Sequence, residues 1–171
     1  MITLDDARKV AEGYKVIPVS MEILADIRTP MEVLSILKSV NNHCYMLESV
    51  EDQERWGRYT FLGFNPKLEI SCVNGQLTIR NGKQETRTVK HPRKAIQEIL
   101  QDYTSPRVKG LPTFTGGLVG YFSYDYVKYS EPKLNLDAEG EEGFKDVDLM
   151  LFDKVIAFDN LKQKIIVIAN A

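Results

Sequence analysis

The stretch that decides the fold class is PKLEISCVNGQLTIRNGKQETRTV, residues 66–89. Apolar and polar residues alternate over residues 68–72, which predicts a strand with one buried and one exposed face. The dipeptides 74–75 and 81–82 are both Asn-Gly, which type I′ hairpin turns prefer because both central residues need a positive φ. The stretch therefore predicts a three-stranded antiparallel meander that is exposed on one face.

A segment upstream of the meander carries the clearest helix signal. Thr29 stands in the N-cap position, Pro30 follows at the first helical position, and Glu32 completes a capping box. This arrangement predicts a helix over residues 30–40. The apolar residues at helical spacing, which we expect to face the core, are Val33, Ile36, Leu37 and Val40.

The remaining segments are mostly strand-like. The other predicted strands cover residues 14–24, 44–49, 58–64 and the first half of 114–131. The other predicted helices cover residues 4–12, 92–103 and the second half of 114–131. Pro18 places the first strand at a sheet edge, because proline cannot donate to a ladder. Two apolar runs that flank Asp159 and Asn160 predict a long hairpin over residues 148–170.

These elements predict an α+β fold for a single domain over residues 1–171. Hairpins and the meander would form antiparallel, sandwich-like β-sheets with helices packed on the outside, because regular βαβ alternation is missing. The length is sufficient for a hydrophobic core. The last apolar run needs neighbours on both faces, which indicates that the chain is part of something larger.

Composition excludes several classes of protein. The formal net charge of -2 gives no electrostatic basis for binding nucleic acid. No window approaches the roughly 20 apolar residues of a membrane-spanning helix, and the N-terminus carries no targeting signal. We therefore expect a cytoplasmic protein that binds neither nucleic acid nor membrane. Cys44 and Cys72 are expected to be reduced core thiols.

The sequence carries no recognisable catalytic or metal-binding constellation. The two histidines, His43 and His91, have no partners at zinc-type spacing. Residues 116–120 read G-G-x-x-G, which fits neither the dinucleotide fingerprint nor the P-loop. Glycine in a strand marks a bulge or the close approach of another backbone, so we expect a structural role for these glycines.

Glu48 and Ser49 directly follow a strand-like apolar run, and two interpretations are open for them. They end a strand in water, or they hold a ligand. A carboxylate binds an ammonium group, and a hydroxyl with neighbouring N–H groups binds a carboxylate. Arg58 adds a planar fork for a carboxylate ligand or for Glu48. Together these groups would suit an amino acid ligand.

The same residues carry a family resemblance. The segments MLESVEDQERWGRYTFLGFNP, residues 46–66, and TGGLVGYFSYDYVKYSE, residues 115–131, resemble the N-terminal region of anthranilate synthase component I. The resemblance extends from Tyr14 to the end of the sequence. It implies an enzyme that converts chorismate to anthranilate in tryptophan biosynthesis. It further implies ammonia from a glutamine amidotransferase partner, Mg²⁺ as cofactor, and feedback inhibition by L-tryptophan.

The resemblance also implies roles for particular residues. The L-L-E-S motif of the family reads Met46-Leu47-Glu48-Ser49 here, and Ser49 takes the position of the family's contact with tryptophan. Leu47, Glu48 and Arg58 are expected to bind tryptophan as well. Met46 departs from the leucine of the motif but nearly conserves its volume.

The resemblance implies that the catalytic and Mg²⁺-binding residues lie in a C-terminal chorismate-binding region, which we expect to be absent from this sequence. The chain alone is therefore expected to be inactive, with no cofactor of its own. It would act as a regulatory part beside its own C-terminal catalytic region and the amidotransferase. Two alternatives stay open: the corresponding region of aminodeoxychorismate synthase component I in folate synthesis, and a stand-alone β-rich binding module.

Overall fold

The computed structural model describes residue 8 and residues 11–48, 57–131, 133–134 and 143–171. The helix predicted over residues 4–12 lies almost wholly outside this part. Contacts divide the chain into two compact units, each made of separate segments. The first unit comprises residues 1–66, 102–117 and 152–171, and the second unit comprises residues 67–101 and 118–151.

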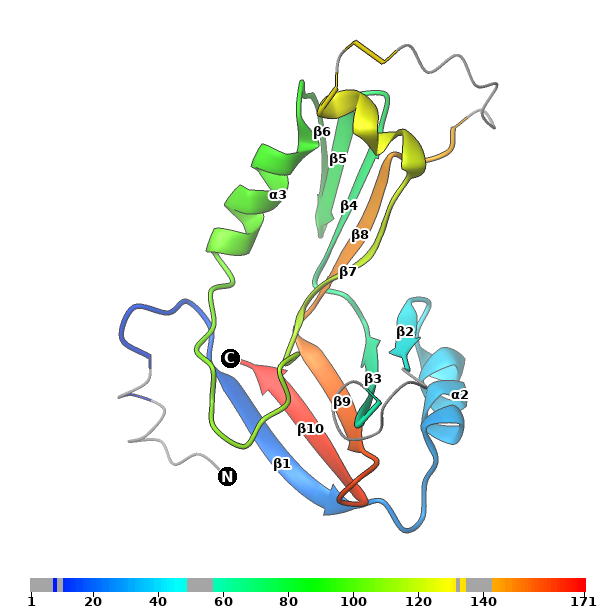
Figure 1. Cartoon of the computed structure of the whole chain (residues 1–171), viewed down its shortest axis with the longest axis vertical. Coiled ribbons are helices and arrows are strands. Elements are labelled where there is room, and N and C mark those ends of the chain that lie inside the picture. Colours follow the sequence, from blue (N-terminus) through cyan, green and yellow to red (C-terminus); the bar gives the residue numbers. More distant parts are fainter. Residues whose placement is uncertain (1–7, 9–10, 49–56, 132, 135–142) are drawn as a thin grey trace. The chain divides into compact units, whose positions relative to one another are not determined.

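The first unit is built on a five-stranded sheet with the strand order β1-β10-β9-β3-β2 (Figure 1). In that order the strands are Pro18–Leu24, Lys164–Asn170, Lys154–Asp159, Tyr59–Phe64 and Cys44–Leu47. Each strand pairs antiparallel with its neighbour. The strand that begins at Pro18 lies at one edge, as its proline predicts.

The second unit is built on another five-stranded sheet, with the order β6-β5-β4-β8-β7. In that order the strands are Lys83–Thr88, Gln76–Asn81, Leu68–Val73, Val147–Phe152 and Gly117–Phe122. The antiparallel registers of β4, β5 and β6 confirm the meander, and β6 is exposed along its whole length. The helices of the described residues are α2 (Pro30–Val40), α3 (Pro92–Gln101) and the 3₁₀ helix η1 (Tyr124–Tyr129). Two antiparallel sheets with so few helices confirm the predicted α+β fold.

Helix α2 packs on one face of the first sheet. It begins as predicted, with the Thr29 N–H donating to the Glu32 carboxylate at 2.8 Å in a complete capping box. Its stripe toward the sheet is formed by Val33, Leu34 and Leu37, which pack with buried Leu62.

The predicted apolar stripe of α2 was therefore half wrong. Ile36 and Val40 are 50% and 72% exposed. At about 100° per residue, Ile36 lies about 105° from the centre of the stripe, and Val40, in the last turn, lies about 65° from it. The helix is narrow and covers the part of the sheet formed by β2, β3, β9 and the end of β10 at Ile165.

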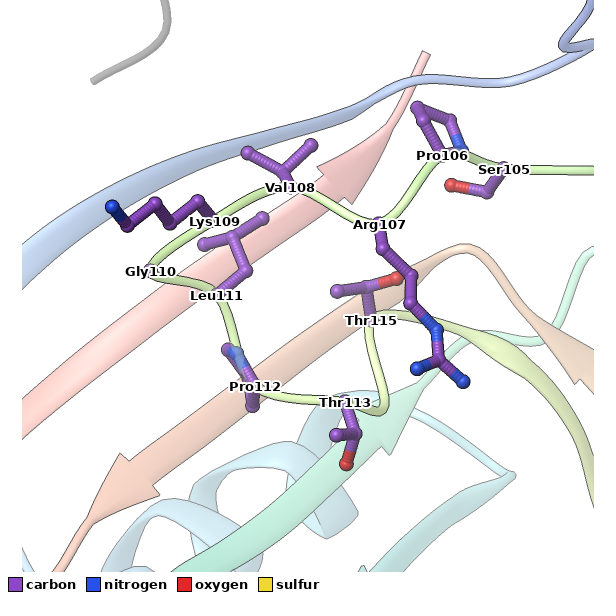
Figure 2. A pocket seen from close by; sticks show the side chains of 10 residues that line it. All are labelled: Ser105, Pro106, Arg107, Val108, Lys109, Gly110, Leu111, Pro112, Thr113 and Thr115. Carbon is purple, nitrogen blue, oxygen red and sulfur yellow. The ribbon is translucent and has the colours of Figure 1, made fainter.

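The opposite face of the first sheet is covered by the loop that leads into β7 (Figure 2). Buried side chains of β9 and β10, including Val155, Ile166 and Ile168, pack there with Leu111 and Phe114 of the loop. The ring of Phe114 also meets the rings of Tyr45 and Phe61 edge-on, with centroids 6.4 and 5.5 Å apart. The loop thus completes a second small core beneath the sheet.

The remaining half of the α2 face carries an exposed apolar strip. On β1, Met21 and Ile23 pair with Val167 and Ile165 of β10, so the four side chains share one face. Met21, Ile23 and Val167 are exposed, Val167 by 37%. The last strand therefore has a covered face and a partly uncovered one.

The apolar run over residues 148–158 forms two strands, not the single arm of a hairpin that the sequence predicts. It divides at Asp153 into β8 of the second sheet and β9 of the first. At this point the Asp153 carbonyl accepts hydrogen bonds from the backbone and side-chain N–H groups of Asn170, at 2.9 and 3.0 Å. The hairpin of β9 and β10 beyond it, with its turn at Asp159 and Asn160, is confirmed.

The two Asn-Gly turns differ. Asn74 and Gly75 both have positive φ, 47° and 79°, as a type I′ turn requires. At the second turn only Gly82 has a positive φ, 69°, while Asn81 stays in β5 and pairs with Lys83. The prediction of a second type I′ turn was wrong because the strand ladder extends one residue further than the dipeptide suggests.

A buried carboxylate attaches η1 to the first turn of the meander. Asp146 accepts hydrogen bonds from the Tyr129 hydroxyl at 2.7 Å, from Lys128 Nζ at 2.6 Å and from the Asn74 N–H at 2.8 Å. Burial raises the pKa of Asp146, but the hydrogen bonds from Lys128 and Tyr129 outweigh burial and hold it below its usual value. The aromatic helix is therefore fixed by a charged network as well as by packing.

The glycines of the G-G-x-x-G pattern have the structural role that the sequence predicts. Gly120, in β7, has φ +155°, and a Cβ there would overlap the carbonyl oxygen of Asp148 in β8. At Gly116 a Cβ would meet the Asn170 side chain at 2.6 Å and the Phe152 carbonyl oxygen at 3.0 Å. Both positions need glycine because another backbone or side chain occupies the space.

Replacing Gly120 by alanine should destabilise the protein by about 3 kcal/mol, because strand β8 must move to admit the methyl group. Gly82→Ala is the matched control, since Gly82 also has a positive φ but no atom lies within 4 Å of its Cβ position. We expect the control to cost about 1 kcal/mol from backbone strain alone. Urea unfolding of both variants measures the difference, and equal losses would contradict the close approach of β7 and β8.

Candidate functional site

The candidate site lies at the end of the hairpin formed by β2 and β3. Leu47, the last residue of β2, pairs with Phe61 of β3. Glu48 follows immediately and is exposed. Ser49, the principal predicted contact, lies outside the described residues. The structure therefore places Glu48, the start of the predicted clamp, at the end of a strand.

Strand β2 separates its side chains between the two faces of the sheet. Met46 packs into the core under α2. Leu47 points to the opposite face, which it shares with Phe61, and is 46% exposed. An accessible leucine beside an accessible carboxylate suits a ligand with an apolar body and a cationic group.

Arg58 forms a two-pronged ion pair with Asp159 of the β9–β10 turn. Its Nε lies 3.0 Å from Oδ1 and an Nη lies 2.6 Å from Oδ2. The Asp159 side chain is buried, and it also accepts from the Lys162 N–H at 3.0 Å. The guanidinium further lies over the Tyr59 ring, 4.8 Å from its centroid. The guanidinium of Arg58 is thus already paired with a carboxylate of the protein. A contact between Arg58 and a ligand stays a prediction.

The pKa values of the pair follow from this geometry. Burial raises the pKa of Asp159, but hydrogen bonds from Arg58 and from the Lys162 N–H outweigh burial and keep it below its usual value. The hydrogen bond to Asp159 in turn raises the pKa of Arg58. Both groups therefore stay charged, which is the state that a strong paired hydrogen bond requires.

Asn160 holds the same end of the hairpin through the backbone. Its N–H donates to the Arg58 carbonyl at 2.8 Å, and its side-chain amide donates to the Gly57 carbonyl at 3.4 Å. The amide also reaches the hydroxyl of buried Thr60 at 3.3 Å. Residues about 100 positions later in the sequence therefore fix where the chain enters β3.

Sequence reasoning missed the role of Asp159 and Asn160, which it assigned only to a turn. The available signal was an acidic residue at the end of a very apolar strand, where a buried carboxylate needs a cationic partner. Nothing local identifies Arg58 as that partner, because 101 positions separate the two residues.

Tyr45 stiffens the hairpin from the middle. Its ring lies against Gly63, its cross-strand partner, where a Cβ would overlap the ring. The ring also meets Phe152 edge-on at 4.7 Å. Burial raises the pKa of Tyr45, and its buried hydroxyl has no hydrogen-bond partner within the part of the chain that the structure describes. The phenol is a packing group there.

No group of three or more His, Cys, Asp and Glu side chains among the described residues could hold a metal ion. No helix among them is long and apolar enough to cross a membrane. Cys44 and Cys72 are free thiols, as predicted.

Comparison with known proteins identifies the family. Residues 41–171 match the family model described as chorismate binding enzyme. The chain belongs to this family. It is also similar to proteins named anthranilate synthase component 1, which confirms the resemblance found in the sequence.

The relatives are much longer than this chain. The protein from Acinetobacter calcoaceticus is 41% identical over 165 residues, which are 93% of this chain and 33% of the relative. The protein from Acetivibrio thermocellus is 36% identical over 169 residues, which are 98% of this chain and 34% of the relative. The crystal structure of anthranilate synthase component I from Streptococcus pneumoniae TIGR4 has a TM-score of 0.55 and 29% identity, covering 87% of this chain and 31% of that one. The chain thus spans about a third of the length of the relatives it matches.

The pair of Arg58 and Asp159 should stabilise the protein as a unit. We expect Arg58→Gln and Asp159→Asn each to lower the free energy of unfolding at pH 7 by about 2–3 kcal/mol. The double variant should lose little more free energy of unfolding than either single variant, because each group stabilises the protein mainly through its contact with the other.

The pH dependence tests the same pair independently. Because the pKa of Asp159 is lowered on folding, its contribution is present above the unfolded pKa of about 3.9 and is lost as the pH falls through the folded pKa. The difference between wild type and Asp159→Asn should therefore shrink below about pH 4. Additive losses at pH 7, or a difference that persists unchanged in acid, would contradict the pairing.

Proposed function

We propose that this chain is the N-terminal, non-catalytic part of an anthranilate synthase component I, and that it contributes to a tryptophan feedback site. The observation that carries the proposal is the match of nearly the whole chain to about a third of proteins with that name. In this proposal the parent enzyme is a lyase of tryptophan biosynthesis that uses chorismate. It would be cytoplasmic.

The titratable groups of the described residues support a non-catalytic role. The two buried carboxylates with lowered pKa values, Asp146 and Asp159, are both fully engaged in ion pairs with lysine or arginine. A general acid or base needs access to substrate and a pKa near the working pH. Neither condition is met by these groups, so we infer that chemistry belongs to other residues of the parent enzyme.

The tryptophan half-site would be built at the end of β2. The Glu48 carboxylate would hold the ammonium group, and the Ser49 hydroxyl with adjacent backbone N–H groups would hold the carboxylate. The exposed face of Leu47, beside Phe61, offers an apolar surface for the indole ring. Arg58 would contact tryptophan directly only if its guanidinium bound Asp159 and the ligand at the same time. We therefore propose that its main role is to hold the chain where it enters β3.

Inhibition would work by linkage between two ligands. Tryptophan bound beside Ser49 would favour an inactive arrangement with the catalytic region, so chorismate and tryptophan would oppose each other's binding. The glutamine amidotransferase would deliver ammonia to that region. The described residues do not fit Mg²⁺, because they contain no cluster of metal-ligating side chains, so we assign the ion to the catalytic region as well.

A chimera tests the proposal. This chain would replace the matching third of the Acinetobacter calcoaceticus relative, and anthranilate formation from chorismate and ammonia would be measured with and without tryptophan. We expect activity that tryptophan inhibits. Ser49→Phe should fill the pocket and raise the tryptophan concentration for half-inhibition by about tenfold or more, a loss of about 1.4 kcal/mol or more in binding.

Three controls separate this role from general damage. Ser39→Phe, at an exposed position of α2, should leave inhibition unchanged. The chain alone should form no anthranilate and should bind tryptophan weakly or not at all in calorimetry. Product analysis distinguishes anthranilate from aminodeoxychorismate. A chimera with Ser49→Phe that stays fully inhibitable, or tight stoichiometric tryptophan binding by the chain alone, would overturn the proposal.

A further inference from the structure

The chain contains two Asn-Gly dipeptides, residues 74–75 and 81–82, and both lie at turns of the β4–β5–β6 meander. An asparagine that precedes glycine is prone to deamidation, because glycine has no side chain to hinder its backbone nitrogen. We propose that Asn81 is a site of spontaneous deamidation in the folded protein, and that contacts with η1 protect Asn74 from the same reaction. The proposal is independent of the tryptophan half-site.

The reaction needs only the protein and water. The glycine nitrogen loses its proton and attacks Cγ of the asparagine; a bond forms between these atoms, and the bond from Cγ to the side-chain nitrogen breaks. That nitrogen leaves as ammonia with a proton from the solvent. Water then opens the cyclic imide at either carbonyl carbon, which yields aspartate or isoaspartate and adds one negative charge. A glycine N–H that can lose its proton and a side chain that can swing onto it are therefore both required.

Both requirements are met at Asn81. Asn81 and Gly82 are exposed, and neither the Asn81 side chain nor the Gly82 N–H forms a hydrogen bond within the part of the chain that the structure describes. No atom lies within 4 Å of the position that a Cβ of Gly82 would take, so nothing blocks the closing ring. Solvent base therefore has direct access to the nitrogen that must lose its proton.

The end of the β5–β6 hairpin also opens easily. Asn81 forms the last pair of the ladder, with Lys83, and ring closure distorts the backbone there, so this pair must open first. Strand β6 lies at the edge of its sheet and is exposed along its whole length. Such hairpin ends fray at little cost in free energy, because few apolar contacts are lost. We therefore expect Asn81 to react almost as fast as it does in the unfolded chain.

At Asn74 the attacking nitrogen is held by η1. The N–H of Gly75, a buried residue, donates to the Tyr129 hydroxyl at 2.7 Å. The hydroxyl donates its own proton to Asp146 at 2.7 Å, so its oxygen is free to accept from Gly75. The N–H must leave this hydrogen bond before it can lose its proton, because removing a partner from a buried donor is costly.

Further contacts hold the rest of the first turn. The Asn74 side-chain oxygen accepts from Lys128 Nζ at 3.0 Å, and the Asn74 N–H donates to Asp146 at 2.8 Å. The Gly75 carbonyl accepts from the Val89 N–H at 2.8 Å. Lys128 polarises the side-chain amide, but this does not start the reaction while the glycine nitrogen keeps its proton. Asn74 therefore reacts only after a larger opening of the second unit, in which the whole network breaks.

Deamidation of Asn81 would change the end of the β5–β6 hairpin. Isoaspartate adds a carbon to the backbone, which shifts the register of the pair with Lys83. Either product places a new carboxylate beside the Lys83 amine. The modification would thus be confined to an exposed edge of the second sheet.

The test follows deamidation at each site by peptide mass spectrometry, with the whole chain kept in mildly alkaline buffer either folded or in urea. In urea the two sites should react at similar rates, because each asparagine precedes glycine. In the folded chain Asn81 should keep a rate within several-fold of its rate in urea, and Asn74 should react about tenfold more slowly than Asn81 or slower still. Tyr129→Phe should raise the rate at Asn74 about fivefold or more and leave the rate at Asn81 unchanged.

Tyr126→Phe is the matched control, because it removes a hydroxyl of the same 3₁₀ helix that forms no hydrogen bond within the described residues. It should leave both rates unchanged. Hydrogen exchange of the wild-type protein is a second measurement that needs no variant, and the Gly75 amide should exchange far more slowly than the Gly82 amide. Equal deamidation rates of Asn74 and Asn81 in the folded chain, equal exchange of the two glycine amides, or a folded Tyr129→Phe variant with an unchanged rate at Asn74 would overturn the proposal.

Discussion

The antiparallel pairing of β3 with β9 is the interaction on which the first unit depends. It joins residues 59–63 to residues 155–159, about 100 positions apart, and it places β2 on one side and β10 with β1 on the other. Buried Leu62 and Ala157 lie within the two strands, and the ion pair of Arg58 with Asp159 stands at the end of their ladder. Such a long-range contact must recover a large loop-closure entropy, which explains why packing, a ladder and a buried charge pair coincide there.

The same pairing gives the candidate site its geometry. Glu48 leaves β2 at one point of the sheet, and Arg58 and Asn160 hold the returning chain at another. The chain that enters β3 is therefore held by the turn between β9 and β10, from the other end of the sequence. This arrangement connects the segment that enters β3 to the buried strands of the unit.

Local patterns predicted the local structure well. The capping box of α2, the meander and the β9–β10 hairpin are specified by residues within a few positions of one another. The division of residues 148–158 between two sheets was missed, because the run of apolar residues is nearly continuous and the contact of Asp153 with Asn170 is not local in the sequence. The face of α2 was misassigned at Ile36 for a similar reason, since the part of the sheet beneath the helix decides which residues are covered. For the candidate site, the planar guanidinium of Arg58 was predicted to bind a carboxylate, but its partner Asp159 was not, because 101 positions separate the two residues.

Native-state hydrogen exchange tests the central claim most directly, namely that the β3–β9 pairing holds the site. Amides of β3 and β9 should exchange only through the largest openings of the first unit, and Arg58→Gln should lower their opening free energies together. Amides of β4 and β5, in the second unit, should serve as internal references and change least. If the amides of β3 opened independently of β9, or if Arg58→Gln left both strands unchanged, the pairing would not be what holds the hairpin and its site in place.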